Sequence, residues 1–192
     1  TAAEKIARRI HRSGSLPVTI VRPALILGER DTSMLPGVVA FLKSPSAVII
    51  GNGKNRLPCI HAGDVADICI LAANMPSAAG EIYNAVSSEY VTQRDLYDAI
   101  AAVTSAQVPR RSVPLRVVYA LAAALEARAR LRGWDHRPDL TRFVVNLIGL
   151  DYQEDPLKTM RDLGWRPQAT LKEMVKRSVE YNRSRRPEPV SR

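Results

Sequence analysis

The stretch Leu16-Pro-Val-Thr-Ile-Val-Arg-Pro-Ala-Leu-Ile-Leu-Gly28 decides how the rest of the chain is interpreted. Its residues from Val18 to Arg22 form an apolar, β-branched run that predicts one buried strand. Pro23 lacks a backbone N–H, so we expect it to remove a ladder hydrogen bond and to turn the chain out of the sheet. Open α/β sheets bind ligands at the carboxyl ends of their strands. The sequence therefore predicts a functional edge that begins at the Arg22-Pro23 step.

The composition is that of a globular protein. The chain has 192 residues, 46% of them hydrophobic, which is enough for a core in one domain or slightly more. It lacks the apolar run of roughly 20 residues that spans a membrane, and its first residues do not form a signal peptide. We expect a cytoplasmic protein with no stable membrane insertion. Cys59 and Cys69 lack metal-type spacing and stand among apolar residues, so we predict two buried free thiols and no metal site.

The net charge of +9, from 28 Lys and Arg against 19 Asp and Glu, suits either nucleic acid or an anionic membrane surface. The excess lies in residues 5–12, 110–132 and 183–192, without interleaved aromatic residues or a recognised nucleic-acid-binding module. We therefore interpret these segments as solvated helix faces and a frayed tail, and we expect no nucleic acid partner.

Periodicity and capping signals predict the remaining elements. The expected helices cover residues 1–12, 34–43, 65–74, a segment from 92, 113–131, 141–148, 155–162 and 171–182, and the expected strands cover 18–22, 47–50, 57–61 and 81–86. Asp64 is expected to cap the helix that follows it. The pairs Thr92 with Asp95 and Thr170 with Glu173 have the spacing of capping boxes.

Residues with catalytic potential are few. Gly51-Asn52-Gly53-Lys54 follows a strand, but no helix follows it and the third glycine is missing, so a tight turn is favoured over a phosphate loop. His61 is interpreted as either a structural histidine or a ligand or base. Arg22 either binds a carboxylate at the sheet edge or pairs with Asp64 or a carbonyl. Glu29, in the loop after the first strand, is a further candidate for ligand contact.

Six motifs occur in one order over nearly the whole chain. They are Thr1-Ala-Ala-Glu-Lys5, Val21-Arg-Pro23 through Leu27-Gly28, Gly51-Asn-Gly53, Cys59-Ile-His-Ala-Gly-Asp-Val-Ala66, Gly80-Glu-Ile-Tyr-Asn84, and Lys158 through Leu163-Gly-Trp-Arg-Pro167. Together they resemble the carboxyl-terminal part of an extended short-chain dehydrogenase/reductase, the superfamily of NAD-dependent epimerases, dehydratases and hydroxysteroid dehydrogenases.

This resemblance implies an α/β fold: the C-terminal part of a Rossmann-like NAD(P)-binding fold plus a small, mostly helical substrate-binding region. The implied segments are 1–33 (end of the Rossmann domain), 34–80 (substrate-region insert and return helix), 81–104 (last Rossmann strand and helix), 105–182 (helical substrate-binding region) and 183–192 (disordered tail). It also implies that the glycine-rich fingerprint and the catalytic Tyr-x-x-x-Lys precede Thr1, so that this chain contains no catalytic residue and is inactive alone.

The resemblance further implies NAD or NADP as the cofactor and a small-molecule substrate. The implied cofactor-binding residues are Arg22, Pro23 and Leu25, and the implied substrate-binding residues are Met34, Leu35, Leu57 and His61. The family pairs through the helix that would end in residues 1–12, which implies a homodimer, or association with the protein's own N-terminal part.

Departures from the family pattern bear on the substrate. Leu57 stands where many nucleotide-sugar enzymes carry an Arg for the diphosphate, and strand alternation turns its neighbour Arg56 to the opposite face. Leu27 stands where Tyr is usual. These changes favour the sterol and hydroxysteroid dehydrogenase-like branch and an apolar substrate. The alternatives are a nucleotide-sugar epimerase or dehydratase, and a non-catalytic binding module on the same scaffold.

Overall fold

The structure, a computed structural model, describes residues 1–133, 138 and 140–184. The chain forms two compact units, each made of segments that are separate in sequence. The first unit comprises Thr1–Thr32, Pro58–Glu89 and Glu154–Arg192, and the second comprises Ser33–Leu57 and Tyr90–Gln153. In the described part of the chain, no helix has the length and apolarity needed to cross a membrane.

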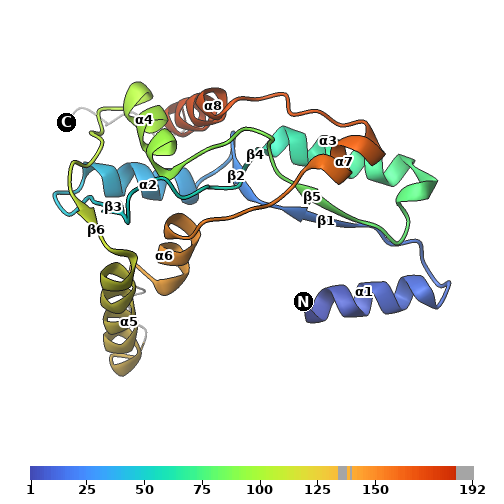
Figure 1. The fold of residues 1–192 in the computed structure, drawn as a ribbon, viewed down its shortest axis with the longest axis horizontal. Helices are drawn as coiled ribbons and strands as arrows, with labels where there is room; N and C mark the ends of the chain where they lie inside the picture. The colour runs from blue at the N-terminus through green and yellow to red at the C-terminus, as the bar shows by residue number, and fades with distance from the viewer. Residues whose placement is uncertain (134–137, 139, 185–192) are drawn as a thin grey trace, which may run out of the picture. The chain divides into compact units, whose positions relative to one another are not determined.

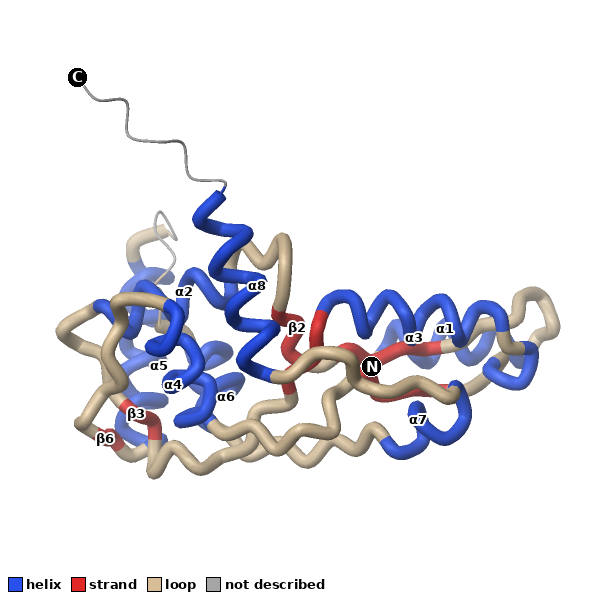
Figure 2. Tube along the Cα trace, turned by 90° about the horizontal axis from the view of Figure 1, so that it is seen from above, coloured by secondary structure: helices blue, strands red, loops and turns tan. Residues whose placement is uncertain are grey.

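Helices and short parallel strands build both units (Figures 1 and 2). The first unit contains α1 (Ala2–Arg12), β1 (Ile20–Pro23), β2 (Leu25–Leu27), β4 (Cys59–His61), α3 (Ala62–Asn74), a 3-10 helix (Pro76–Ala78), β5 (Ile82–Ala85), α7 (Leu157–Leu163) and α8 (Leu171–Ser184). The second contains α2 (Met34–Lys43), β3 (Ile49–Ile50), α4 (Gln93–Val103), β6 (Ser112–Val113), α5 (Leu115–Leu131) and α6 (Arg142–Gly149).

The strands of the first unit exchange partners along the chain. β1 pairs in parallel with β5, from Ile20 opposite Ile82 to Pro23 opposite Ala85. β2 pairs in parallel with β4, with Leu27 opposite His61. The N–H of Ser87, just after β5, donates to the carbonyl of Cys59 at 2.9 Å. β4 therefore lies between β2 and the continuation of β5.

Pro23 does not turn the chain out of the sheet, which corrects the sequence-based expectation. The N–H groups of Ile20 and Ala24 donate to the carbonyls of Glu81 and Ala85, both at 3.0 Å. Since alternate residues of a strand face opposite edges, the nitrogen of Pro23 lies on the edge away from β5, where no ladder bond is lost. The chain continues directly into β2, a strand that the sequence did not predict.

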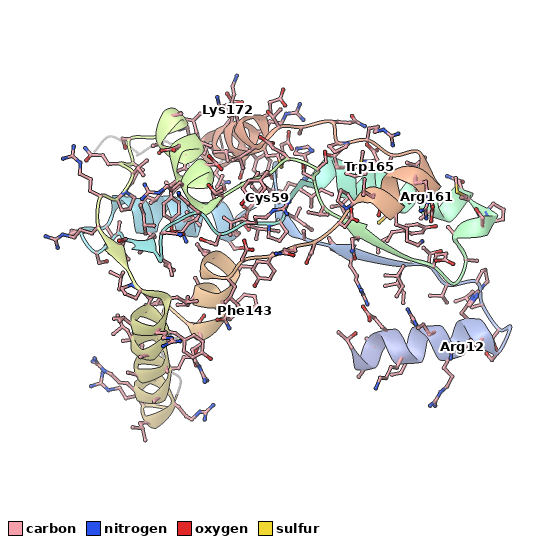
Figure 3. All side chains as sticks on the ribbon, viewed as in Figure 1. Arg12, Cys59, Phe143, Arg161, Trp165 and Lys172 are labelled. Atoms are coloured by element: carbon pink, nitrogen blue, oxygen red, sulfur yellow. The ribbon has the colours of Figure 1, made fainter. Side chains whose placement is uncertain are left out.

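The core of the first unit packs α3 and α7 against the paired strands. Its buried residues are Ile60, Ile68, Ala72, Ala78, Tyr83, Ala85, Leu163 and Trp165. Cys59 lies on β4 (Figure 3), and burial raises the pKa of its thiol to about 12. Cys69 is exposed, contrary to the prediction, because the helical turn that directs Ile68 inward directs Cys69 outward.

The second unit has a smaller sheet and a buried polar connection. β3 and β6 pair in parallel, and Ile50 packs with Val118, Ala122 and Val145 of α5 and α6. Gln93, at the start of α4, is fully buried. Its side-chain oxygen accepts a hydrogen bond from the Ile50 N–H at 2.9 Å, and its Nε2 donates to the carbonyl of Ile148 at 3.0 Å.

The capping boxes and the glycine turn that the sequence predicted are present in the structure. Thr92 and Asp95 form the expected capping box, and Thr170 and Glu173 exchange the same hydrogen bonds. Residues 51–53 form a turn in which both glycines take positive φ, 67° and 72°. Of the predicted tail, residues 183 and 184 belong to α8, and residues 185–192 lie outside the described residues.

Asp64 does not cap α3, which corrects the prediction. His61 is the N-cap residue, and its Nδ1 accepts a hydrogen bond from the Gly63 N–H at 3.1 Å. The helix begins earlier than its apolar pattern indicated. Asp64 therefore lies inside the first turn, and its carboxylate accepts the Gln168 N–H at 3.1 Å instead.

The substitution Gln93→Leu tests the buried connection in the second unit. The variant leaves the Ile50 N–H buried without a partner, while the Ile148 carbonyl keeps its hydrogen bond from Nδ2 of Asn55, so the free energy of unfolding should fall by about 1 to 3 kcal/mol. Urea denaturation followed by circular dichroism measures this loss. Gln107→Leu, at an exposed position of the same unit, should change stability little. Equal losses in both variants would contradict the proposed role of Gln93.

Candidate functional site

The candidate site lies in the first unit, at the carboxyl ends of β1, β2 and β4. Between β1 and β2, the N–H of Ala24 donates to Ala85 and that of Leu25 donates to the carbonyl of Pro58 at 2.8 Å. Within β2, Leu25 faces β4, so alternation directs the N–H of Ile26 away from β4. The carbonyl of Pro23 and the N–H of Ile26 therefore lie on an edge that no described strand covers.

Arg22, at the same end of β1, is held by a carboxylate of α1. Its Nε and Nη2 donate to the two carboxylate oxygens of Glu4, both at 2.8 Å. The Arg22 guanidinium lowers the pKa of the Glu4 carboxyl to about 2. From the sequence, Asp64 or a carbonyl was the expected structural partner of Arg22. In the structure the partner is Glu4.

His61 connects β4, α3 and the loop after β2. It is 7% exposed, and its Nε2 lies 3.1 Å from Oε2 of Glu29. Because Nδ1 accepts the Gly63 N–H, neutral His61 carries its proton on Nε2 and donates it to Glu29. Both ring nitrogens are thus used inside the unit. This geometry makes His61 a residue that positions the Gly28–Glu29 loop.

Gly28 allows the close approach of this loop to the imidazole. Its φ is +134°, and a Cβ at this position would lie 2.9 Å from both Cδ2 and Nε2 of His61. An L-residue would therefore meet backbone strain and a clash with the ring together. Gly28 is required for the contact between Glu29 and His61.

Glu29 is the carboxylate of this loop that contacts both His61 and Arg177. A hydrogen bond from its own backbone N–H and the hydrogen bond with His61 lower the pKa of its carboxyl, against the opposing effect of partial burial. Nη1 of Arg177 on α8 lies 4.0 Å from Oε1 of Glu29, so an arginine also faces the carboxylate. The nearby Asp64 carboxyl is buried, and this burial raises its pKa.

The predicted site residues fall in two groups. Arg22, Pro23, Leu25 and His61 all belong to the first unit, and Leu25 and His61 lie on the paired strands β2 and β4. Met34, Leu35 and Leu57 belong to the second unit, where Leu35 is 1% and Leu57 3% exposed. Their contacts with a cofactor or substrate stay predictions. Within the described residues, no cluster of His, Cys, Asp and Glu has the geometry of a metal site.

Sequence reasoning missed three residues that organise this region. Glu4 and Arg177 are helix residues whose charge gives no hint of a partner distant in sequence. Gly28 was included in a family motif, but its contact with His61 was not expected. The available local signal was Glu29, which the sequence placed in the loop after the strand.

Comparisons with known proteins find similarity over part of the chain to one family model and over most of the chain to several curated proteins. Residues 1–85 match the model of the NAD dependent epimerase/dehydratase family. The chain spans about half the length of the curated relatives it matches. The solved structures that the chain resembles have a Rossmann-like α/β fold, which confirms the predicted fold class.

Two curated relatives carry different enzyme names. The chain is 26% identical to the 2-alkyl-3-oxoalkanoate reductase of Shewanella oneidensis, over 91% of this chain and 48% of that protein. It is also 26% identical to the sterol-4-alpha-carboxylate 3-dehydrogenase (decarboxylating) of Mus musculus, over 83% of this chain and 46% of that protein. The sterol branch is therefore among the relatives, but these identities do not single it out.

Solved structures share the fold. A nucleoside-diphosphate-sugar epimerase from Pseudomonas aeruginosa superposes with a TM-score of 0.71 at 20% identity, covering 95% of this chain and 53% of that chain. A UDP-glucuronic acid 4-epimerase from Bacillus cereus, solved with UDP-glucuronic acid and NAD, gives a TM-score of 0.64 at 15% identity, covering 94% and 50%. At these identities the likeness shows the fold alone.

The Arg22–Glu4 pair yields a pH-dependent prediction. In Arg22→Gln, the pKa of Glu4 should rise from about 2 toward the ordinary carboxyl value of 4.5. Because the pKa is lower in the folded state, the pair stabilises the protein above pH 4.5, and this contribution is lost as the pH falls toward 2. An NMR titration of the Glu4 side-chain carboxyl carbon measures the shift. An unchanged Glu4 pKa in the variant would contradict the assignment.

The substitution Gly28→Ala tests the close packing on His61. Backbone strain and the clash with the ring should lower the free energy of unfolding by about 2 kcal/mol or more. Gly37→Ala provides a control, because Gly37 lies within α2 and a Cβ at this position would meet no atom within 4 Å. That variant should be more stable by about 0.5 to 1 kcal/mol. Thermal and urea denaturation should therefore show opposite signs for the two alanines.

Proposed function

We propose, from the premise that this chain is related to the NAD-dependent epimerase/dehydratase family, that it is the C-terminal portion of an NAD(P)-dependent oxidoreductase. In this proposal, the glycine-rich fingerprint and the catalytic Tyr-x-x-x-Lys lie in residues encoded before Thr1. The 192-residue portion supplies the nicotinamide-side loop and part of the substrate pocket, and it is inactive alone.

The observation that carries the proposal is a pair of backbone groups, one at the end of β1 and one in β2. A nicotinamide carboxamide offers one carbonyl acceptor and one NH₂ donor. The N–H of Ile26 and the carbonyl of Pro23 are the complementary groups, and both lie on the edge away from β4 and β5. The backbone N–H of Leu25 is already bonded to Pro58 and its carbonyl faces the same neighbour, β4, so Leu25 would contact the cofactor through its side chain.

The residues of this chain would orient the cofactor and leave the chemistry to other groups. When bound, the nicotinamide supplies or accepts the hydride. Arg22, fixed by Glu4, would hold its charge at the end of β1 beside the cofactor. His61 and Glu29 would hold the loop after β2 in place, since their hydrogen bond joins this loop to the start of α3.

The proposed substrate is an apolar, sterol-like molecule with a hydroxyl/keto pair. Leu57 occupies the position of the diphosphate-binding Arg, and an apolar side chain there suits an apolar substrate. The names of the two relatives, a 2-alkyl-3-oxoalkanoate reductase and a sterol-4-alpha-carboxylate 3-dehydrogenase, both describe an oxygen function at carbon 3 beside a carboxylated carbon. We therefore propose 3-hydroxy or 3-oxo carboxylates with a large hydrocarbon part as the substrate class.

Two alternatives remain to be distinguished. A nucleotide-sugar epimerase or dehydratase has the same fold as the solved structures. Against it, the guanidinium of Arg56, the nearest candidate for a diphosphate, lies over the Tyr90 ring at 4.6 Å from its centre. A non-catalytic binding module would keep the scaffold and lack the upstream Tyr-x-x-x-Lys.

A homodimer is part of the same proposal. α1 exposes Ile6 at 61% and Ile10 at 39%, and none of its residues is buried. An amphipathic helix with an exposed apolar stripe is suited to pairing with a second copy. Association of this helix with the protein's own N-terminal part is the alternative.

The full-length protein should oxidise NADPH or NADH when given a 2-alkyl-3-oxoalkanoate, and it should show no thermal shift with UDP or dTDP. Cofactor absorbance measures the first and a melting experiment the second. A clear thermal shift with either nucleotide, without turnover of the oxo acid, would favour the nucleotide-sugar alternative. The absence of an upstream Tyr-x-x-x-Lys and glycine-rich fingerprint from the encoded sequence would overturn the enzyme assignment altogether.

A further inference from the structure

α5 has two apolar faces, although a surface helix needs only one. The inner face contains Val118 and Ala122, which are 6% and 0% exposed and pack with Ile50 and Val145. The second face, here called the outer stripe, consists of Val117, Ala120, Leu121, Ala124, Ala127 and Leu131, most of them exposed. Val117 is 56%, Leu121 53% and Leu131 89% exposed. Figure 3 shows side chains extending from α5 on both sides of the helix.

Arginines border the outer stripe. With about 100° between successive residues, Arg116 falls at one border and Arg132 at the other, and Arg128 lies within the stripe, near its C-terminal end. The single acidic residue of α5 is Glu126, and its carboxylate binds the side chain of Arg142 at 2.7 Å. Among the described residues, no carboxylate forms an ion pair with Arg116, Arg128 or Arg132. The outer stripe is therefore apolar in its N-terminal half and cationic at its borders and its C-terminal end.

We infer that the outer stripe of α5 is a docking surface for an anionic membrane, on which the helix lies parallel to the bilayer plane. Leu121 and Val117 would enter the boundary between head groups and acyl chains. The arginine side chains can extend their guanidinium groups from there to the lipid phosphates. With 17 residues, α5 is about 25 Å long, so it adsorbs to the surface and does not span the bilayer.

The charge pattern distinguishes this partner from two others. A second copy docked through the same stripe would bring two sets of arginines together, with Glu126 already bound to Arg142. A nucleic acid would use the arginines but would leave Val117 and Leu121 in water. An anionic lipid surface is the partner that matches both the cations and the apolar half of the stripe. This inference does not depend on the proposed catalytic function, because it concerns binding alone.

Vesicle co-sedimentation of the full-length protein tests the inference. The protein should bind vesicles of an equal mixture of phosphatidylcholine and phosphatidylglycerol, and not vesicles of phosphatidylcholine alone. The double variant Arg128→Gln/Arg132→Gln should reduce the partition coefficient roughly 30-fold. The double variant Val117→Gln/Leu121→Gln should reduce it about tenfold or more. Circular dichroism and the melting temperature confirm that each variant is folded.

Matched controls separate this surface from general attraction between the protein and anions. Arg8→Gln/Arg9→Gln on α1 removes the same charge, and Ile70→Gln on α3 removes an apolar side chain that is 59% exposed. Both controls should bind the anionic vesicles almost as the unchanged protein does. Equal losses in the α1 variant, or full binding by Val117→Gln/Leu121→Gln, would overturn the inference in favour of non-specific polyanion binding. Failure of the unchanged protein to bind anionic vesicles would also overturn it.

Discussion

The exchange of strand partners between Ala24 and Leu25 is the constraint on which the first unit depends. Two successive N–H groups donate to two different strands, that of Ala24 to Ala85 and that of Leu25 to Pro58. The segment from Ile20 to Leu27 thereby pairs first with β5 and then with β4. β4 lies between β2 and the continuation of β5, so β1 and β2 share one open edge on their other side. The carboxyl ends of the strands meet beside the loop at Gly28. A proline at position 23 is compatible with this path because its nitrogen faces the open edge.

The same exchange explains why His61 has a structural role. β4 ends at His61, where α3 begins, so the imidazole caps the helix and faces the chain that leaves β2. One nitrogen accepts the first-turn N–H of Gly63, and the other is left to donate to Glu29. The tautomer is thus set by the helix start, and the loop position is set by the tautomer. Gly28 has to lack a side chain because the loop passes directly over the ring.

Features determined by neighbouring residues could be predicted from the sequence, and features determined by distant partners could not. The positive φ of Gly51 and Gly53 depends on a few adjacent residues, whereas the strand at 25–27 is too short to show a period and exists because β4 lies beside it. The candidate site shows the same division. The motif resemblance found Arg22 because this residue is part of a short pattern. It did not find Glu4, whose pairing with Arg22 requires α1 to lie beside β1 in space.

The net charge of +9 is unevenly distributed along the chain, so some cations have carboxylate partners and others have none. In the first unit, Lys158 lies between Glu81 and Asp162, and Arg22 is bound to Glu4, so these cations are locally compensated. On α5, one carboxylate faces several arginines and is already engaged by Arg142. Arginines without a carboxylate partner cost little free energy in water. They and the exposed apolar side chains beside them gain favourable interactions when both meet an anionic, partly apolar surface. The positive charge of this protein is therefore better understood as a property of particular helix faces, that of α5 among them, than of the whole chain.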